Sequence, residues 1–251
     1  MSHKQHSNHP DPAAAGSTSS FAHHPATNPE KSFRWRGGEI TRLEAFCDVV
    51  FGFALTLLVV SLEVPHSYSE LIADMRGFLP FAVCFSQLVM IWVTHYRFSR
   101  RYGLQDSYTL FLNMVLLFVV LLYVYPLKFV FTLVISEVTG GDLGRDLTFQ
   151  NASTLMQIYA IGFGLVFLLF VLLYAHAYAL RDKLELNKVE LHETKMSMQS
   201  NAILALIGFA SLLIAFRSPA WAGWSFMLIG PALTLHGSLV GRKVRKLEPN
   251  A

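Results

Sequence analysis

Charged residues are scarce in this chain of 251 residues. Asp, Glu, Lys and Arg make up 15% of it and hydrophobic residues 53%, whereas soluble domains carry about a quarter charged residues. The formal net charge of +3 is too small to indicate nucleic acid as a partner. The composition therefore excludes an ordinary soluble domain, and the clustering of charges between long apolar blocks indicates a polytopic membrane protein.

Cysteine is also rare, because Cys47 and Cys84 are the only two in the chain and both fall inside apolar segments. Two cysteines placed in this way exclude a disulfide framework and show no metal-ligand spacing. The catalytic signatures Gly-x-Ser-x-Gly and His-Glu-x-x-His are missing as well. We therefore predict no enzymatic activity, no cofactor and no metal site.

Six apolar segments are present, each of about 20 residues or more, which is the length that a helix needs to cross a hydrocarbon core. Their hydrophobicity is continuous rather than alternating, which predicts helices and not a barrel. The predicted fold is all-α, with six transmembrane helices per subunit. The segments cover about residues 41–63, 78–98, 107–135, 153–180, 197–216 and 219–240.

The chain divides into three parts by composition. Residues 1–33 are rich in His, Ser, Ala and Pro and lack the apolar surface that a fold needs, so we expect a disordered cytoplasmic tail. No cleavable signal peptide is evident in it. Residues 34–246 form the predicted membrane domain, and residues 247–251 form a short C-terminal tail.

Lys and Arg residues lie mostly on one side of the predicted spans. They gather at residues 31–42, 97–101, 181–195 and 242–246. The other side has Arg76, Arg145 and Arg217. By the positive-inside rule, both termini are predicted to be cytoplasmic.

An arginine and an aspartate, Arg42 and Asp48, stand six residues apart at the head of the first apolar segment. Such groups are costly in a membrane helix and commonly face a partner or a water-filled cavity. Helical periodicity places large side chains of this segment on one stripe. The stripe comprises Phe46, Val49, Phe53, Thr56, Leu57, Val60 and Val64. From periodicity alone, this stripe fits either the lining of a pore or packing against lipid and other helices.

Motifs in the first three segments resemble those of one family. The pattern Arg42-x-x-x-Phe46-Cys47-Asp48 resembles the Arg-x-x-x-Phe-Ser-Asp motif of the transmembrane protein 175 family, which comprises potassium channels of bacteria, endosomes and lysosomes. Cys47 stands in place of the usual Ser and weakens one hydrogen-bond donor. The segment from Trp92 to Arg97, WVTHYR, resembles the Trp-x-x-His-His-Arg pattern of the family's second helix. Asn113 resembles the Asn at the start of its third helix.

The resemblance implies a potassium-permeable channel in the bacterial inner membrane, built as a homotetramer in the lipid bilayer. In the family the first helix lines the pore, and large apolar residues form a hydrophobic constriction. These positions correspond here to Phe53, Leu57 and Val60, with Thr56 as a polar site. Phe53 replaces the Ile or Leu that is common in the family, so its ring is expected to change pore width.

The resemblance also suggests a polar network behind the pore helix. We expect the Asp48 carboxylate to accept hydrogen bonds from Trp92 and His95, with Arg42 and Asn113 satisfying what remains, because buried polar groups are tolerated only when paired. Glu63 lies near the outer end of the first helix. There it forms either an acidic ring that concentrates cations at the mouth or an ordinary interfacial charge.

Two other functions are compatible with six apolar segments. A proton-coupled secondary transporter could use Asp48 and His95 as a relay, although the chain shows no inverted repeat and no matching pair of broken helices. A membrane enzyme or scaffold without transport is the third hypothesis. The Thr-Val-Gly-Tyr-Gly filter of common potassium channels is missing, so any selectivity must have another origin.

Overall fold

The computed structural model describes residues 33–60, 67–138 and 148–244, and every regular element in this part of the chain is helical. The predicted disordered tail lies outside the described residues except for Phe33, and Glu63, Val64 and residues 247–251 lie outside them entirely. The elements are α1 (Arg42–Val60), α2 (Tyr68–Tyr102), α3 (Ser107–Val138), α4 (Phe149–Ala179), α5 (Lys188–Ala215), α6 (Pro219–Ser225), the 3-10 turn η1 (Phe226–Leu228) and α7 (Ile229–Val244).

The all-α membrane fold that the sequence predicts is confirmed. Within the described residues, five helices (α1 to α5) are long and apolar enough to cross a membrane. The sixth segment, predicted at residues 219–240, is helical but divided, because the 3-10 turn η1 joins α6 to α7. Two helices are longer than predicted: α2 begins at Tyr68, and α5 begins at Lys188 inside the charged connector.

Local sequence explains several helix boundaries. Asn187 and Glu190 form a capping box at the start of α5, in which each side chain accepts from the backbone N–H of the other residue. Thr148 caps α4 through a bond from the Asn151 N–H. Pro126 lies within α3, where tight packing in a membrane bundle tolerates a residue that breaks helices in water.

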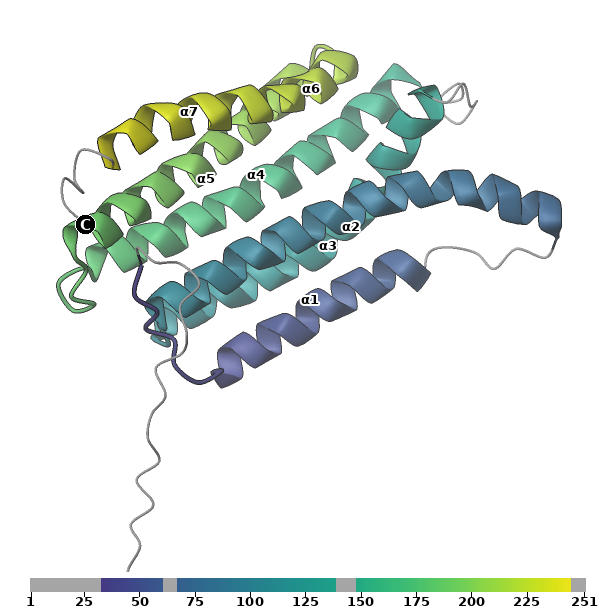
Figure 1. The fold of residues 1–251 in the computed structure, drawn as a ribbon. Coiled ribbons are helices and arrows are strands. Elements are labelled where there is room, and N and C mark those ends of the chain that lie inside the picture. The colour runs from purple at the N-terminus through teal and green to yellow at the C-terminus, as the bar shows by residue number, and fades with distance from the viewer. Residues whose placement is uncertain (1–32, 61–66, 139–147, 245–251) are drawn as a thin grey trace, which may run out of the picture.

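The long helices lie side by side, with α1 at one edge of the bundle and α7 at the opposite edge (Figure 1). α1 packs on α2 and α3, α4 joins α3 to α5, and α7 lies on α5. α4 and α5 approach closely at Gly164 and Gly208, where a Cβ on Gly208 would meet the Gly164 backbone at 2.9 Å. Small residues of this kind let membrane helices pack tightly. The outward side of α1 faces no other described helix of its own subunit.

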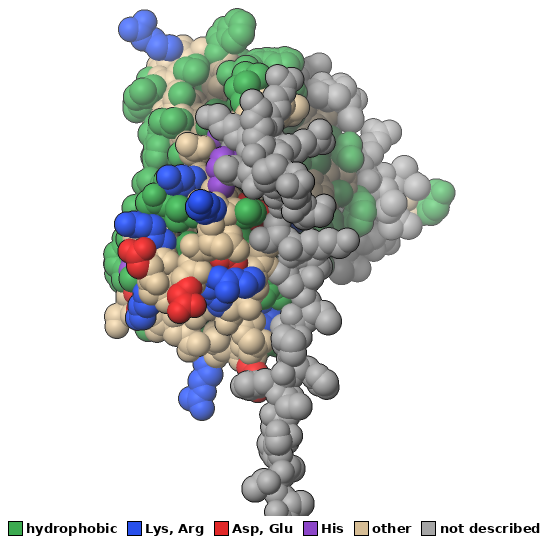
Figure 2. Space-filling model, turned by 60° about the vertical axis from the view of Figure 1, so that its left-hand side comes forward, with side chains coloured by type: hydrophobic (Ala, Val, Ile, Leu, Met, Phe, Trp, Pro, Cys, Tyr) green, Lys and Arg blue, Asp and Glu red, His purple; other side chains and the backbone are tan. Residues whose placement is uncertain are grey.

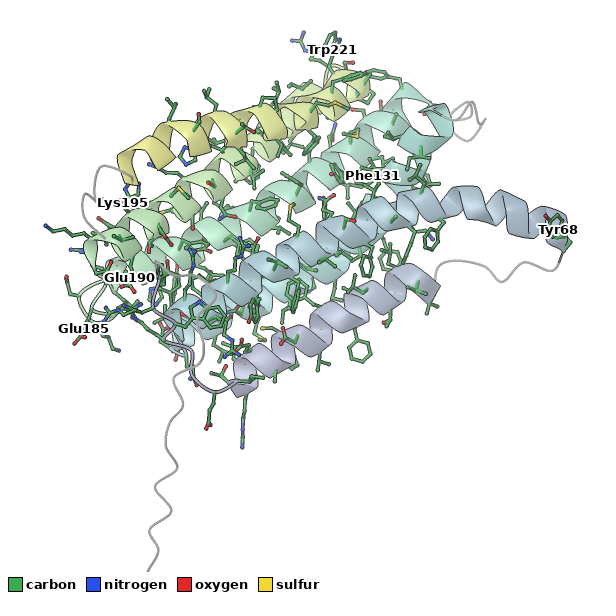
Figure 3. All side chains as sticks on the ribbon, in the orientation of Figure 1. Tyr68, Phe131, Glu185, Glu190, Lys195 and Trp221 are labelled. Atoms are coloured by element: carbon green, nitrogen blue, oxygen red, sulfur yellow. The ribbon has the colours of Figure 1, made fainter. Side chains whose placement is uncertain are left out.

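The two ends of the bundle differ in character. Charged side chains gather over one end in the space-filling view, and hydrophobic side chains cover much of the flank (Figure 2). Glu185, Glu190 and Lys195 lie at the charged end, and Tyr68 and Trp221 lie at the other end (Figure 3). Exposed Trp and Tyr residues at the end of a span are typical of a membrane–water interface.

Candidate functional site

α1 has one buried and one exposed apolar side. Cys47, Phe51, Ala54 and Leu58 are buried against the bundle at intervals of three or four residues. This spacing keeps the four side chains on one side of the helix. The subunit therefore fixes how α1 is rotated about its axis.

The exposed side of α1 carries the predicted stripe. Phe53 is 62% exposed, Leu57 38% and Val60 79%, and Phe46 and Val49 are exposed as well. The Thr56 hydroxyl lies on the same side and donates to the Phe53 carbonyl at 2.8 Å. Large side chains left uncovered on an apolar helix need a partner outside the subunit, either lipid or further protein.

Behind α1, the polar residues of the motifs form two hydrogen-bonded pairs. The indole Nε1 of Trp92 on α2 donates to Asp48 Oδ1 on α1 at 2.8 Å. His95 Nε2 and Asn113 Oδ1 are also 2.8 Å apart, and the Asn113 amide nitrogen donates to the Thr109 carbonyl at 2.8 Å. The Asn113 amide nitrogen donates to Thr109, so the amide oxygen is the atom that faces His95. An amide oxygen can only accept a hydrogen bond, and His95 Nε2 therefore carries the proton. His95 is 1% exposed, so this pair lies inside the bundle.

The arrangement differs from the single network that the sequence suggested. Within the described residues, no hydrogen bond joins Asp48 to His95, and Arg42 has neither a hydrogen bond nor an ion pair. The reason is geometric: six residues correspond to about 240° around a helix axis, so Arg42 and Asp48 point in different directions. Arg42 is exposed at the first turn of α1.

A second polar cluster lies at the charged end and was not foreseen from the sequence. Residues 33–38, which we call the strap, run from the first described residue toward α1 and dock on α5 and α2. Glu190 of α5 is 0% exposed and accepts from Arg34 Nε at 3.2 Å and from Arg36 Nη2 at 2.7 Å. Backbone N–H groups of Arg34 and Asn187 donate to the same carboxylate. The strap is thereby held by a fully buried anion that accepts from both side chains and backbone.

The other end of the strap is tied to α2 and α1. The Gly37 N–H donates to the Arg100 carbonyl at 3.1 Å, and Arg100 Nη1 donates back to the Gly37 and Gly38 carbonyls. A Cβ on Gly37 would meet the Ser99 carbonyl at 3.0 Å, so this close approach favours glycine. Arg100 also pairs with the buried Glu44 in the first turn of α1 at 3.6 Å. The first turn of α1 is thus linked through α2 and the strap to α5.

Aromatic contacts add to the docking of the strap. Phe33 is buried, with its ring edge-to-face against Tyr102 at 5.6 Å. The Arg101 guanidinium lies 4.7 Å from the centroid of the Phe33 ring, and such cation–π contacts stabilise by about 0.5–2 kcal/mol. Phe33 was predicted to be the last residue of the tail, but it is the first buried residue of the folded part.

One carboxylate near this end is strongly paired. Asp106, between α2 and α3, accepts from Thr109 and lies 2.7 Å from His176 Nε2 of α4. Burial works against the ionised form of Asp106, but the hydrogen bonds from Thr109 and His176 outweigh it. The pKa of Asp106 therefore lies below its ordinary value.

Nothing in the described part of the chain indicates a metal centre, since no group of three or more His, Cys, Asp or Glu side chains there could hold an ion. The site consists instead of an uncovered apolar side on α1, paired polar groups behind it and an ionic strap at one end. This arrangement defines a polytopic helical membrane protein whose first helix is packed against the bundle on one side and exposed on the other.

Comparison with known proteins identifies the family. The sequence profile described as endosomal/lysosomal potassium channel TMEM175 matches residues 42–123, the part that carries both polar pairs. A protein of Marivirga tractuosa named a potassium channel is 39% identical over 236 residues, which cover 88% of this chain and 94% of that protein. A potassium channel of Chamaesiphon minutus is 29% identical over 163 residues, covering 62% of this chain and 73% of that protein.

Solved structures agree with the sequence comparison. A crystal structure of a variant of the potassium channel MtTMEM175, in complex with a nanobody fusion protein, matches with a TM-score of 0.74 and 37% identity, covering 86% of this chain and 98% of the other. A lysosomal potassium-selective channel homolog from Chamaesiphon minutus matches with a TM-score of 0.56 at 22% identity, covering 77% and 95%; at that identity the likeness concerns the fold. The chain belongs to the TMEM175 family.

Proposed function

We propose that this chain is one subunit of a potassium-permeable cation channel, through which ions flow passively down their electrochemical gradient. The observation that carries the proposal is the uncovered apolar side of α1, which presents Phe53, Leu57 and Val60 while the opposite side is buried in the bundle. We take potassium as the permeant ion because the relatives are named potassium channels. Apolar constrictions gate conduction by excluding water.

One helix cannot enclose a pore, so several copies of the chain must converge. We propose a homotetramer in which the exposed sides of four α1 helices face a central axis. Phe53, Leu57 and Val60 then form the constriction, and the Thr56 hydroxyl supplies a polar site beside it. Glu63, outside the described residues, lies at the outer mouth in this arrangement.

The proposed orientation places the charged end in the cytoplasm and the channel in the bacterial inner membrane. Support comes from the charged strap end, which carries the start of α1 and the end of α7, together with the Lys and Arg clusters of the sequence. Trp221 and Trp224 are exposed at the opposite end, where they suit the outer interface.

The alternative of a proton relay through Asp48 and His95 receives no support from the geometry of the described residues. Asp48 is bonded to Trp92, and His95 to Asn113. The two side chains therefore have separate partners, and no direct bond between them offers a path for a proton.

Purified protein reconstituted into liposomes tests the proposal. With a potassium gradient as the driving force, we expect a potassium current whose reversal potential follows that gradient. When a pH gradient is added in a second measurement, the reversal potential should not change. A reversal potential that moves with the pH gradient would indicate proton coupling. An absence of flux from folded, oligomeric protein would contradict the channel.

A further inference from the structure

A further set of buried polar side chains joins α2, α3 and α4 within their membrane spans. Gln87 Nε2 on α2 donates to the Tyr123 hydroxyl on α3 at 2.9 Å. The Tyr123 hydroxyl is in turn hydrogen-bonded to Tyr159 on α4, and the two rings lie 5.5 Å apart. Both tyrosines are buried. We call Gln87, Tyr123 and Tyr159 the tyrosine layer.

The surrounding helices are shaped to hold this layer. A Cβ on Gly162 of α4 would lie 2.5 Å from the Tyr123 ring, so only glycine leaves room for the ring beside α4. Tyr159 also packs against Phe226 of η1, with ring centroids 5.0 Å apart. An unpaired hydroxyl among apolar neighbours is costly, and the hydroxyl of each tyrosine has a partner within the layer.

The backbone of α3 is weakest beside the same layer. Pro126 lies within α3 and has no N–H, so the Leu122 carbonyl four residues earlier lacks its helical donor. Prolines inside long helices are common places of bending. Tyr123 lies between these two residues. Its two side-chain bonds therefore hold α3 to α2 and α4 at the place where the helix alone is least rigid.

This stretch of α3 also supports α1. Val124, which follows Tyr123, is buried and lines one groove together with Leu57 and Leu58 of α1. Leu58 belongs to the buried side of α1, and Leu57 belongs to the exposed side. A shift of α3 at Tyr123 would therefore move the surface against which this turn of α1 packs.

We propose that the tyrosine layer sets the width of the conduction path at Leu57, because it fixes α3 behind this turn of α1. Gln87, Tyr123 and Tyr159 are positioning residues, since none of them lies on α1 or touches the ions. The inference rests on the proposed function, because Leu57 borders a pore only in an assembled channel. It deepens that function by assigning part of the ion preference to buried hydroxyls outside the pore.

Bi-ionic recordings of reconstituted Tyr123→Phe channels test the proposal. The substitution keeps the ring and removes both hydrogen bonds of the hydroxyl. We expect the ratio of potassium to sodium permeability to fall about threefold, an effect of the size that coupled residues without ligand contact produce. Single-channel conductance should rise, because Leu57 loses its fixed support. Both quantities belong to each open channel and do not depend on how much protein folds.

Tyr102→Phe is the matched control. Tyr102 is a buried tyrosine of α2 at the charged end of the bundle, and its hydroxyl lies 2.7 Å from the Thr194 hydroxyl. This variant should lower the unfolding temperature and leave the permeability ratio and the conductance unchanged. If Tyr123→Phe gives the same result as Tyr102→Phe, the layer is only structural and the proposal is wrong.

Tyr159→Phe is the second variant and also serves if Tyr123→Phe does not fold. It removes only the acceptor of Tyr123 and should lower the permeability ratio in the same direction. The double variant should equal Tyr123→Phe alone, because that substitution has already broken the bond between the two tyrosines; fully additive effects would contradict the layer.

Failure of this inference is distinguishable from failure of the channel. Wild-type protein that does not conduct would overturn the proposed function, and the inference with it. Conducting wild-type protein, together with Tyr123→Phe and Tyr159→Phe channels of unchanged permeability ratio and conductance, would overturn the inference and leave the channel intact.

Discussion

Phe53 combines a large ring with 62% exposure on the open side of α1. Four such rings at one level would form the narrowest and driest part of the proposed pore. We therefore expect Phe53→Ala to raise single-channel conductance and to weaken the preference for potassium over sodium. Current recordings under bi-ionic conditions give both quantities.

Phe118→Ala provides the matched control for this prediction. Phe118 lies on α3 and is 67% exposed, so the two variants remove the same ring from similarly exposed positions on different helices. Conductance and selectivity should be unchanged in Phe118→Ala. If both variants behave alike, Phe53 has no special place in the conduction path.

The Trp92–Asp48 pair gives a second prediction. Trp92→Phe removes the donor but keeps an aromatic ring, leaving a half-buried carboxylate without its 2.8 Å partner. A hydrogen bond to a charged group stabilises by about 1.5–3 kcal/mol, so the unfolding temperature of the purified oligomer should fall. Trp221→Phe alters an exposed indole and should have little effect.

A double-mutant cycle separates the hydrogen bond from general packing in this pair. Trp92→Phe should cost less stability when Asp48 is already replaced by Leu, because the acceptor has gone. Strictly additive effects of the two substitutions would show that the pair is not coupled.

Asp106 supplies a prediction on pH. Its pKa is lowered in the folded protein, so its contribution to stability is present above its unfolded pKa of about 4. That contribution disappears as the pH falls through the lower, folded value. Between about pH 6 and pH 3, wild-type protein should lose more stability than Asp106→Asn does.

Thermal unfolding across this pH range is the measurement for Asp106. Asp182→Asn is the control, since Asp182 lies in the exposed connector before α5 and its side chain is 89% exposed. Identical acid dependence in the wild type and both variants would mean that the Asp106–His176 pair does not contribute to stability.

The strap connects the first turn of α1 to α2 and α5 through Glu190 and Arg100. Glu190→Gln leaves Arg34 and Arg36 without their buried anion and places an amide N–H₂ group among donors. We expect a loss of about 2–4 kcal/mol, measured as a lower unfolding temperature. Faster proteolysis before Arg42 should accompany it, because the strap is no longer held.

Glu185→Gln is the control for Glu190→Gln. It tests whether loss of any carboxylate near the start of α5 lowers stability, or only loss of the buried one that pairs with Arg34 and Arg36. Glu185 lies in the same connector and its side chain is exposed, although its carbonyl accepts from Arg34. This variant keeps that carbonyl and should behave as wild type. A stable, protease-resistant Glu190→Gln protein would contradict the role given to the strap.

The elements show what the sequence could and could not predict. Apolar length located the five described helices that are long and apolar enough to cross a membrane, because a span needs a continuous run of suitable residues. The start of α5 at Lys188 lies outside the predicted span of residues 197–216, because apolar length marks the part of a helix that crosses the membrane and not its charged extension. Motif resemblance pointed to Trp92 and Asp48 as a pair, but the partner of His95 depends on how α2 and α3 are packed.

The strap could not be predicted, for a physical reason. Arg34 and Glu190 lie 156 positions apart, and no periodicity relates them. The spacing of Asn187 and Glu190 is that of a capping box, but this spacing gives no sign that the Glu190 carboxylate is also buried beside two arginines. The contact exists because the bundle brings the start of α5 beside the chain that precedes α1.

For the whole assembly, Glu63 lies outside the described residues, and the role that we propose for it at the outer mouth is electrostatic. It follows Phe53 by ten residues in the sequence, and we propose that it acts separately from the constriction. Glu63→Gln should reduce inward current at low salt and leave it nearly unchanged at high salt, because salt screens such a charge within about 10 Å at 0.1 M. The preference for potassium over sodium should be unchanged at both salt concentrations. A defect that persists in molar salt would assign the carboxylate a structural role.

We propose that the exposed side of α1 faces the potassium pathway of an assembled channel. Silver ions are close in size to potassium and react with thiols, while the native Cys47 and Cys84 are both buried. The most direct measurement is therefore the effect of silver ions on potassium current through Phe53→Cys and Phe118→Cys channels. We expect rapid, irreversible block of Phe53→Cys channels, with wild type and Phe118→Cys unaffected. Conducting Phe53→Cys channels that silver does not block would contradict a pore-facing position of Phe53.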